Sequence, residues 1–575
     1  MTALLTDNLP LLAGAPNGIK KLRELILELA VRGKLVPQDP SDEPASELLK
    51  RIAEDKARLV AGTRVKKQKA FAEISAEEKP YTLPSGWEFA RLGDLVDPRR
   101  TITYGVLKPG GDTTDGVPLI KTENVQFNLI LTEFKSRISA ELDEEYKRTR
   151  LQGGEVLLTL VGSIGRCAIA PIELVGANLS RSVGMIVPLS GVDKRFMVYA
   201  VTSLIDEAFI LKNCAGTAQK VLNVGTVNDM PYPLPPIAEQ HRIVAKVDEL
   251  MGLCDQLEAQ QADADSAHTQ LVQALLDSLT QARDAGDFAQ SWQRLAEHFH
   301  TLFTTESSID ALKQTLLQLA VMGKLVPQDP SDEPASELLK RIAEEKATLI
   351  AEGKIRKQKQ LAEITEEEKL FELATGWEWS RLGEQVIESG AGWSPSCEPR
   401  PREGNDWGVL KVSAVSWGVY RPEENKALPV SLEARPEHEV AEGDFLVSRA
   451  NTAELVARSV VVDSTPSRLM LSDKIVRLRL TKLCDAHYLN LVNSATHARQ
   501  YYARVAGGTS SSMKNVSREQ ILSLPIAVPP LPEQHRIVAK VDQLMAFCDQ
   551  LKARLNQARQ VHEQLANALV EQAVA

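Results

Sequence analysis

The sequence predicts an α+β protein made of two similar halves, each of which combines a mixed α/β domain with long helices. Three observations indicate this fold class. The chain has 575 residues, which is more than one hydrophobic core supports. Two blocks recur almost unchanged, about 290 residues apart, and a long heptad pattern follows each variable block. A period of this length far exceeds the roughly 20–50 residues of solenoid repeats. It therefore predicts two half-units related by a pseudo-twofold axis.

The repeated blocks define the organisation of each half. Residues 33–54 (GKLVPQDPSDEPASELLKRIAE) are identical to residues 323–344, and EQHRIVAKVD occurs at both 239–248 and 533–542. Between these blocks lie two segments that resemble each other poorly. We therefore expect helical arms at 1–96 and 283–386, variable domains at 97–230 and 387–524, and long helices at 231–282 and 525–575.

The arm blocks are predicted to be helical because their apolar residues recur at helical spacing. This stripe consists of Leu22, Leu25, Ile26 and Leu29 in the first copy and Leu312, Leu316 and Leu319 in the second. The ASELLKRIAE helices have candidate N-caps at Ser41-Asp42 and Ser331-Asp332, with Pro44 and Pro334 in the first turn. Basic clusters follow at 64–69 and 354–359. They fit a solvated helix face, a phosphate contact or docking to an acidic partner.

Short β-branched runs bounded by Gly, Pro and Asn predict strands in both variable blocks. The runs are 119–125, 155–161 and 183–189 in the first block and 409–415, 444–450 and 474–480 in the second. Each block ends in a helix-like stretch followed by a Gly-Thr pair, at 216–217 and 508–509. The two blocks are expected to share a fold and to differ at their surfaces, as two readers of different ligands would.

Apolar residues that recur at alternating spacings of four and three positions predict a helix of about 40 residues in each half. These helices would start near Pro235-Pro236 and Pro529-Pro530. The seam residues are Ile243, Val247, Leu250, Cys254 and Leu257 in the first copy and Ile537, Val541, Leu544, Cys548 and Leu551 in the second. The same spacing continues through His268 and Leu271 to Leu275, and through His562 and Leu565 to Leu569. Two matched seams are natural partners for each other, and a long helical pair would act as a spacer.

The cysteine and histidine positions argue against a metal site. Cys254, Cys548, His268 and His562 occupy seam positions, where they fit packing better than metal binding. His241 and His535 lie off the seam, and no second ligand stands at metal-binding spacing from either. The six cysteines are far apart and form no CxxC pair, which favours a reducing cytoplasm over a disulfide framework.

Charge and hydropathy exclude other classes. The sequence contains no apolar run of about 18 residues, the length needed to span a membrane, so no membrane-spanning helix is expected. The net charge of −10 is unusual for a nucleic-acid binder. However, the variable blocks are nearly neutral, with 15 Lys and Arg against 15 Asp and Glu in 97–230 and 17 against 16 in 387–524. The acidity therefore resides in the remaining helical parts and leaves room for local basic surfaces.

No catalytic signature is present in the sequence. There is no GxxxxGK[ST] loop for phosphates, no GxGxxG after a strand, and no Asn/Asp-Pro-Pro-aromatic loop of the kind that amino-methyltransferases use. The ExK pairs at 54–56 and 344–346 lie in predicted helices rather than at strand ends, where a nuclease would hold Mg²⁺. We therefore expect neither catalytic residues nor an enzyme activity in this chain alone.

Taken together, these features resemble the specificity subunit of Type I restriction–modification systems, in its long-armed (Type IB-like) branch. The residues that carry the resemblance are PLPP-x-x-EQHRIVAKVD with the CDQL that follows, at 233–257, its counterpart at 529–551, and GWE-x-x-RLG at 86–93 and 376–383. The resemblance covers nearly the whole chain.

The resemblance implies that each variable block is a target recognition domain that reads one half of a split, asymmetric sequence in double-stranded DNA. The long helices would pack antiparallel as a coiled coil, set the gap between the half-sites and dock two modification subunits. Two restriction subunits would complete this cytoplasmic phage-defence complex. The chain would hold no cofactor itself, because S-adenosylmethionine, ATP and Mg²⁺ would bind to the partner subunits.

Residue type selects the candidate DNA contacts, since Arg and Lys can bind guanine and Asn can bind adenine. In the first domain they are Lys121, Thr122, Glu123, Asn124, Arg166, Asn178, Arg181, Thr217 and Lys220. In the second they are Lys411, Ser413, Arg449, Asn451, Thr452, Thr509, Ser510, Ser511, Ser512 and Lys514. A phosphate contact or a solvated loop position is the alternative for each. Trp87, Trp377 and Trp379 are expected to anchor the domain cores.

Two other functions remain as alternatives for the whole chain. A coiled-coil scaffold that binds only protein predicts no salt-dependent DNA affinity. A self-sufficient methyltransferase or nuclease requires a cofactor motif, and the sequence contains none.

Overall fold

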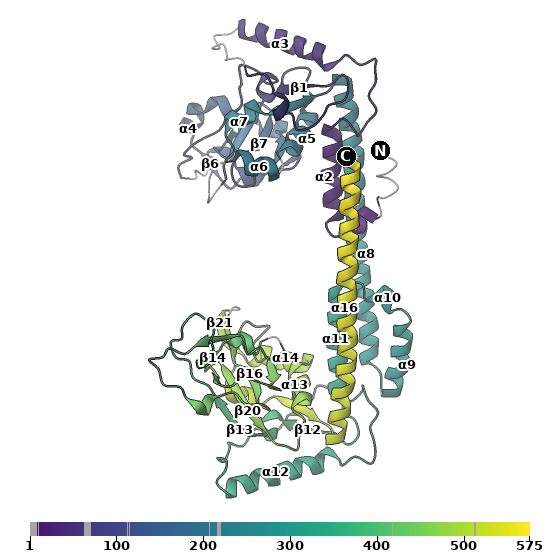
Figure 1. Cartoon of the computed structure of the whole chain (residues 1–575), viewed down its shortest axis with the longest axis vertical. Coiled ribbons are helices and arrows are strands. Elements are labelled where there is room, and N and C mark those ends of the chain that lie inside the picture. Colours follow the sequence, from purple (N-terminus) through teal and green to yellow (C-terminus); the bar gives the residue numbers. More distant parts are fainter. Residues whose placement is uncertain are drawn as a thin grey trace. The chain divides into compact units, whose positions relative to one another are not determined.

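A computed structural model shows the internal duplication (Figure 1). The structure describes residues 9, 11–61, 71–111, 113, 115–205, 207–214, 220–283, 285–416, 418–510 and 513–574. By their contacts, the residues separate into two compact units: unit 1 contains 1–263 and 559–575, and unit 2 contains 264–558. Both units contain helices and strands built from corresponding segments, so the α+β duplication is confirmed.

The variable part of unit 1 is built on a four-stranded antiparallel sheet. Its strands, in spatial order, are β2 (Thr103–Tyr104), β10 (Val183–Ile186), β7 (Val156–Thr159) and β8 (Cys167–Ile169). All residues of β7 and β10 are buried, which explains why they appear in the sequence as continuous apolar runs. Beside it lie a three-stranded sheet and a hairpin, formed by β6 (Arg137–Ile138), β3 (Val117–Ile120) and β9 (Asn178–Leu179), and by β4 (Val125–Gln126) and β5 (Leu129–Ile130).

Unit 2 repeats this topology. Its four-stranded sheet contains β13 (Val386–Ala391), β20 (Ile475–Leu480), β16 (Phe445–Ser448) and β18 (Ser459–Val461). Its three-stranded sheet contains β15 (Asn425–Ala427), β14 (Gly408–Leu410) and β19 (Leu469–Met470). A further sheet is formed by β17 (Ala450–Asn451), β22 (Met513–Asn515) and β21 (Gly507–Ser510). Among the described residues of unit 1, the bridge between Val161 and Val221 lies at the corresponding place.

Four of the six predicted strands are confirmed and two end early. The runs at 119–125 and 409–415 leave the sheet after Ile120 and Leu410 and continue as the 3₁₀ turns η3 (Thr122–Asn124) and η8 (Val412–Ala414). In the first copy, the Asn124 side chain accepts a hydrogen bond from the Lys121 N–H at 3.0 Å. This local bond offers the backbone an alternative to the ladder and stops the strand.

A short ladder closes each variable domain and leads into a long helix. β1 (Glu88–Arg91) pairs with β11 (Pro231–Leu234), and β12 (Glu378–Arg381) pairs with β23 (Pro525–Val528). Directly after these ladders begin α8 (Ile237–Thr280) and α16 (Leu531–Val574), each of 44 residues, as the Pro-Pro positions predict. α8 begins in unit 1, and its residues from 264 onward belong to unit 2. α16 begins in unit 2, and its residues from 559 onward belong to unit 1.

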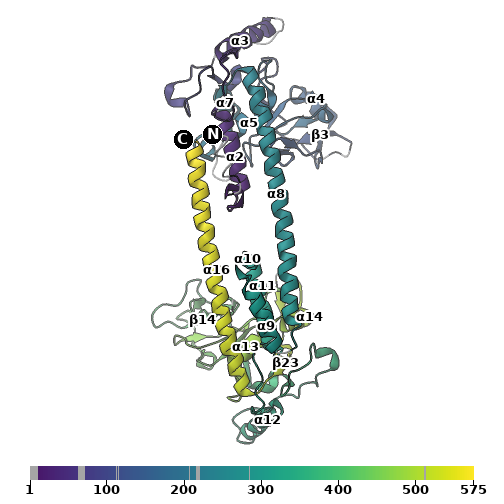
Figure 2. The ribbon, with the colours of Figure 1, turned by 90° about the vertical axis from the view of Figure 1, so that its right-hand side faces the viewer.

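The seam of each long helix packs on an arm helix of the same unit, which corrects the expectation that one seam packs directly on the other. In unit 1, α2 (Gly18–Val31) lies between α8 and the last residues of α16 (Figure 2). Arg23 forms ion pairs with Asp255 and Glu258 of α8, while Lys21 pairs with Glu563 of α16. Nine of the 14 residues of α2 are buried, and a helix that is apolar on most sides needs neighbours on more than one of them.

The buried stripe of the long helices also departs from the heptad prediction. Cys254 and Cys548 are buried as expected, but further on Leu271 and Leu565 are 52% and 47% exposed. The buried positions are instead Val272 and Ala566, each 18 residues after the cysteine of its helix. Eighteen residues are five turns of a straight helix at 3.6 residues per turn, so the stripe stays on one face without the supercoil that a 3.5-residue period requires.

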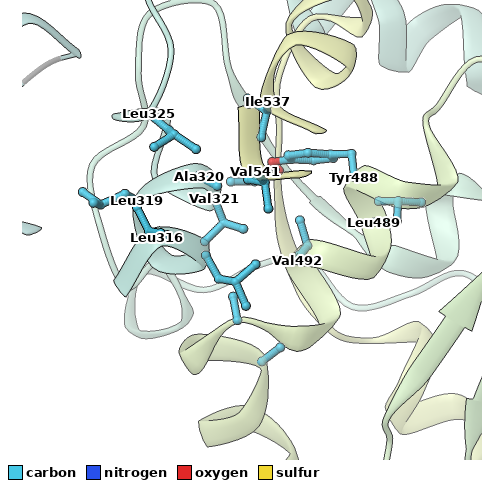
Figure 3. Close-up of a cluster of buried hydrophobic side chains, with 14 of the residues drawn as sticks. Leu316, Leu319, Ala320, Val321, Leu325, Tyr488, Leu489, Val492, Ile537 and Val541 are labelled. Atoms are coloured by element: carbon cyan, nitrogen blue, oxygen red, sulfur yellow. Dashed lines mark hydrogen bonds between the residues drawn. The ribbon is translucent and has the colours of Figure 1, made fainter. Parts of the chain in front are cut away.

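In unit 2, the variable domain is joined to the helices by one apolar core (Figure 3). Leu316 and Val321 of α11 (Glu306–Val321), Tyr488 and Val492 of α13 (Ala486–Ser494) and Ile537 of α16 are all buried there. The Tyr488 hydroxyl also donates to the carbonyl of Ala527 at 2.8 Å. This core holds the domain in a fixed position on the helices of its own unit.

The second helix of each arm does not use the N-caps predicted at Ser41-Asp42 and Ser331-Asp332. α3 (Ala45–Ala61) and α12 (Ala335–Ala351) begin after Pro44 and Pro334, and the Pro334 N-cap has no side-chain bond. Asp42 and Asp332 instead form ion pairs with Arg242 and Arg536 of the long helices, at 2.7 and 2.6 Å. These charge-assisted bonds tie both carboxylates to the long helices.

The remaining helices connect these elements. They are α4 (Ala140–Glu145), α5 (Lys194–Leu204), α6 (Glu207–Asn213), α7 (Val224–Asp229), α9 (Ala285–Ala296), α10 (Phe299–Leu302), α14 (Thr496–Val505) and α15 (Arg518–Leu522).

The basic cluster at 64–69 lies outside the described residues, whereas Arg356 and Lys357 of the second cluster are exposed. In the part of the chain that the structure describes, no helix is both long and apolar enough to cross a membrane.

Candidate nucleic-acid interface

The EQHR runs form the junction between each variable domain and its long helix. The Glu239 carboxylate accepts hydrogen bonds from Trp87 Nε1 at 2.9 Å and from Gln38 Nε2 at 3.1 Å. In unit 2, Glu533 accepts from Trp377 Nε1 at 3.0 Å and from Gln328 Nε2 at 3.2 Å. Burial raises the pKa of both carboxyl groups despite these donors. The tryptophans are buried, which confirms Trp87 and Trp377 as core anchors.

The next residues of the run hold a helix of the variable domain. Gln240 accepts from the backbone N–H of Asp193 at 2.7 Å, and Asp193 in turn caps α5. His241 lies 3.7 Å from the Asp193 carboxylate, and His535 lies 3.5 Å from Asp485 in the equivalent place. The local sequence suggested that these imidazoles are isolated. The fold instead brings a carboxylate from a distant segment close to each of them. Among the described residues, no group of three or more potential metal ligands occurs.

Trp379 and the seam cysteines have packing roles in the structure. The Trp379 ring is partly buried, with its centroid 5.0 Å from that of Phe371. Burial raises the pKa of the Cys254 thiol, and it raises that of Cys548 to about 11. Both thiols therefore stay protonated and behave as small apolar groups.

The variable domain of unit 1 contains an open cavity of about 880 Å³. Among the described residues, its lining includes four cations, Lys108, Lys121, Arg166 and Arg181, and one carboxylate, Glu123. Thr122, Gln126 and three serines supply neutral donors and acceptors. A local excess of cations in a chain of net charge −10 is the electrostatic feature expected where phosphates bind.

A hydroxyl in the β7–β8 hairpin positions Arg166. Thr159 Oγ1 accepts from the Arg166 N–H at 2.9 Å and donates to the carbonyl of Ser163 at 2.5 Å. Gly162 and Gly165 have φ values of +81° and +92°, which let the loop turn tightly around this hydroxyl. Within the described part of the chain, neither the Arg166 nor the Arg181 guanidinium has an ion pair or a hydrogen bond. Both are therefore available to a ligand.

The η3 turn contributes three more candidates to the same cavity. Thr122 Oγ1 donates to the carbonyl of Val161 at 3.0 Å, which ties this turn to the β7–β8 loop. Lys121 Nζ donates to Ser136 Oγ at 2.5 Å, and Glu123 is exposed at the cavity wall. The fold thus brings five of the nine predicted residues of this domain together: Lys121, Thr122, Glu123, Arg166 and Arg181.

The two predicted asparagines have internal roles instead. Asn178 is buried, donates to Asp143 at 2.8 Å and accepts from Thr149 at 2.7 Å. Asn124 is also buried, and its amide donates to the carbonyls of Leu131 and Glu133. These side chains shape the loops and present no free group to a ligand. Lys220 is exposed outside the cavity lining, and Thr217 lies outside the described residues.

The prediction from sequence did not include Lys108, Gln126, Ser163, Ser180 and Ser182, which also line the cavity. Lys108 precedes Pro109-Gly110-Gly111, and turn residues of this kind predict a surface loop in which binding residues are common. Nothing in the local sequence distinguishes the other four from ordinary surface residues, because only the sheet register brings them to one wall.

In unit 2, the corresponding hairpin is closed by the same pattern of hydrogen bonds, but the polar side chains around it differ. Ser448 Oγ accepts from the Arg458 N–H at 3.1 Å and donates to the carbonyl of Leu455 at 3.0 Å. Arg458 thus takes the place of Arg166, but burial lowers its pKa. Counted back from the equivalent strands β10 and β20, Asp473 occupies the position of Arg181. One scaffold therefore presents two different sets of polar groups.

The predicted residues of the second domain lie on adjoining turns and strands. Lys411 and Ser413 both contact the Glu424 carboxylate, at 3.4 and 2.8 Å. Asn451 Nδ2 donates to Ser416 Oγ at 2.8 Å, and Lys514 Nζ donates to the carbonyl of Gly508 at 2.7 Å. Thr452 is exposed and Arg449 is half-buried. Thr509 and Ser510 belong to β21, while Ser511 and Ser512 lie outside the described residues.

Comparisons with a family model and with full-length relatives agree on one family. Residues 84–264 and 376–559 match the family model of the Type I restriction modification DNA specificity domain. The chain is 43% identical over 577 residues to the specificity subunit of the Type I restriction enzyme EcoEI of Escherichia coli, covering 97% of this chain and 94% of that one. It is 37% identical over 584 residues, with the same coverage, to the EcoAI specificity subunit of Escherichia coli.

A chain from a solved type I R-M system aligns over 86% of this chain and 99% of its own length, at 17% identity. Its TM-score of 0.47 is too low to add to the assignment. The family model and the two full-length relatives are sufficient: this chain belongs to the specificity subunits of Type I restriction enzymes, which determine DNA specificity and are not the catalytic subunits.

Proposed function

We propose that this chain directs a Type I restriction–modification complex to a split DNA sequence, each variable domain reading one half-site. The observation that carries the proposal is the cavity of unit 1, where Lys108, Lys121, Arg166 and Arg181 face a single carboxylate among the described lining residues. The domains would have the boundaries 97–230 and 387–524, flanked by arms at 1–96 and 283–386 and by long helices at 231–282 and 525–575.

The groups in the cavity suit both parts of DNA recognition. Lysine and arginine contacts to phosphate set the position of the protein on the duplex, and contacts to base edges select the sequence. The guanidinium groups of Arg166 and Arg181, which have no partner among the described residues, could bind guanine through two bonds, and Gln126 could bind adenine in the same way. Because unit 2 carries Arg458 and Asp473 at the equivalent positions, its domain would read a different half-site.

The long helices would set the gap between the half-sites by running antiparallel between the two domains. Residues 258–267 of α8 are exposed throughout, and this surface could dock modification subunits. Two modification subunits would supply S-adenosylmethionine and methylate adenine. Two restriction subunits would add ATP, Mg²⁺ and cleavage, and the complex would act on DNA in the cytoplasm.

Exchange of the first variable domain tests this proposal. Residues 97–230 would be replaced by the corresponding segment of a relative, and the methylated sequence would be mapped by methylome sequencing of cells that carry the modification subunit. We expect one half-site to change while the other half-site and the gap are retained. A simultaneous change of both half-sites would contradict the assignment of one reader to each half. Absence of any DNA methylation that depends on this chain would instead favour a purely protein-binding scaffold.

A further inference from the structure

Each variable domain carries a short loop of the same length beside its predicted DNA-contact turn. In unit 1, the hairpin β4–β5 follows η3, and the Leu131 N–H donates to the carbonyl of Asn124 at 2.8 Å. In unit 2, the Arg421 N–H donates to the carbonyl of Ala414 at 3.0 Å. Both bonds close a loop over seven residues, and both loops follow a 3₁₀ turn that begins after Lys121 or Lys411.

The tips of the two loops are alike in conformation and in residue type. Asn128 and Gly418 occupy equivalent positions and both adopt positive φ, +53° and +76°. The next residue is an exposed aliphatic one in both loops, since Leu129 is 56% and Val419 is 64% exposed. The preceding residue is aromatic in both sequences, Phe127 and Trp417, although the placement of Trp417 lies outside the described residues.

Packing within the fold does not explain why the exposed residues Leu129 and Val419 are both aliphatic. Single exposed aliphatic residues are common on protein surfaces and by themselves indicate nothing. Here, however, two domains whose sequences resemble each other poorly both have an aliphatic side chain at the same exposed loop position. More than half of each side chain contacts solvent, so neither contributes much to its own core. A shared contact outside the chain explains the repetition better.

The position of the tip in unit 1 indicates what that contact is. Gln126 lines the cationic cavity, while Leu129 and Leu131 line a second cavity of about 530 Å³; Lys121 and Glu123 line both. The apolar tip therefore lies at the rim of the surface that carries the cations. On the edges of DNA bases, the C5-methyl group of thymine in the major groove is the apolar feature, and phosphates flank it. An aliphatic side chain beside several cations matches this pattern.

We propose that Leu129 and Val419 are specificity-determining residues that contact thymine C5-methyl groups, each in the half-site read by its own domain. This inference rests on the proposed function of the two domains. Adenine modification implies at least one A·T pair, and hence a thymine, in each half-site. In unit 1, the β4–β5 hairpin would thus contact the apolar methyl group, while the adjoining cavity binds polar base edges and phosphates.

The test replaces thymine by deoxyuridine, which keeps the same hydrogen-bonding edge and lacks only the methyl group. The complex of this chain with its modification subunits would be titrated against duplexes that contain the mapped site, with one thymine replaced at a time. We expect about fourfold weaker binding at one or more positions of each half-site, the effect of one buried methyl group. Leu129→Ala would abolish this sensitivity in one half-site only, and Val419→Ala would abolish it in the other.

Two matched controls separate this effect from a general change of the surface. Ile172 and Val430 are exposed aliphatic residues of the same two domains, 69% and 96% exposed, and neither lines a described cavity near the tips. Ile172→Ala and Val430→Ala should leave both the affinity and the deoxyuridine pattern unchanged.

The outcomes distinguish this inference from the proposed function. If the complex binds its site specifically but no deoxyuridine duplex differs by more than about twofold, the methyl contact is wrong and the function stands. If Leu129→Ala lowers recovery of the modification subunit and leaves the deoxyuridine pattern intact, the tip contacts protein and the inference is also wrong. If the unmodified site binds no better than random DNA, the proposed function itself fails.

Discussion

The indole Nε1 of Trp377 lies 3.0 Å from a carboxylate oxygen of Glu533, and Trp87 and Glu239 repeat the pair at 2.9 Å. Each pair joins the segment that enters a variable domain to the first turn of the long helix that leaves it. The bond is buried at both ends, so it fixes the domain relative to its helix. If the variable domains read DNA half-sites as proposed, this junction fixes each reader relative to the long helix that leaves it.

Loss of this carboxylate should destabilise unit 2. Glu533→Ala leaves the Trp377 and Gln328 N–H groups without their acceptor, and we expect the free energy of unfolding to fall by about 1–3 kcal/mol. Glu533→Gln keeps an acceptor oxygen and should cost less. Denaturant unfolding followed by tryptophan fluorescence would measure both. Glu442→Ala removes an exposed glutamate of the same unit and serves as the control.

The buried His497 should make unit 2 sensitive to acid. Burial lowers the pKa of its imidazole from 6.5 to about 4, and in the described structure neither ring nitrogen has a hydrogen-bond partner. The folded state therefore binds this proton less readily than the unfolded state. The neutral ring contributes stability that is fully present above pH 6.5 and is lost as the pH falls from 6.5 towards 4.

His497→Leu should therefore flatten the decline in stability below pH 6.5, by an amount on the order of 3 kcal/mol at pH 4. Thermal unfolding of the variant and of the parent between pH 4 and 8 would show this difference. The exposed His300→Gln is the matched control and should follow the parent. Parallel curves for His497→Leu and the parent would show that another group causes the acid sensitivity.

Arg166 and Arg181 should contribute to DNA binding through one half-site only. Removal of a guanidinium that contacts a base should cost about 1–3 kcal/mol and relax the preference at one position, whereas removal of a phosphate contact should reduce the salt slope by about one. Titrations of Arg166→Ala and Arg181→Ala complexes at several salt concentrations would separate the two roles. Lys147→Ala, an exposed cation of the same domain outside the cavity, should change neither quantity.

Insertion of four residues near Ala264 should change the gap between the half-sites. At about 1.5 Å per residue the insertion lengthens α8 by roughly 6 Å, close to two base pairs, and it rotates the following residues by about 40°. Residues 258–267 are exposed, so the insertion itself disturbs no core, although Val272 must repack. We expect a gap longer by one or two base pairs with both half-sites intact, as mapped by methylome sequencing. An active variant with an unchanged gap would show that α8 does not set it.

Local patterns in the sequence were sufficient for the duplication, the start of both long helices and most of the strands. Pro235-Pro236 marks the start of α8 because proline restricts the residue before it, and the run at 155–161 is a strand because its residues are β-branched and apolar. These signals act within a few residues of the chain. The family resemblance rests on the EQHR block, whose side chains are constrained by their partners, the buried Trp87 together with Gln38 and Asp42.

Which polar residues are available to a ligand, and which neighbours the helices have, depends on contacts that the local sequence does not specify. Asn178 and Arg181 are three residues apart and looked equally suitable for binding DNA. Yet Asn178 is buried against Asp143, while Arg181 reaches the cavity. The seams of α8 and α16 likewise meet the arm helices, because α2 and α11 are apolar enough to lie between them. Burial and pairing depend on contacts between distant segments, 35 residues apart for Asn178 and Asp143 and 232 apart for Arg23 and Asp255, and local spacing does not encode them.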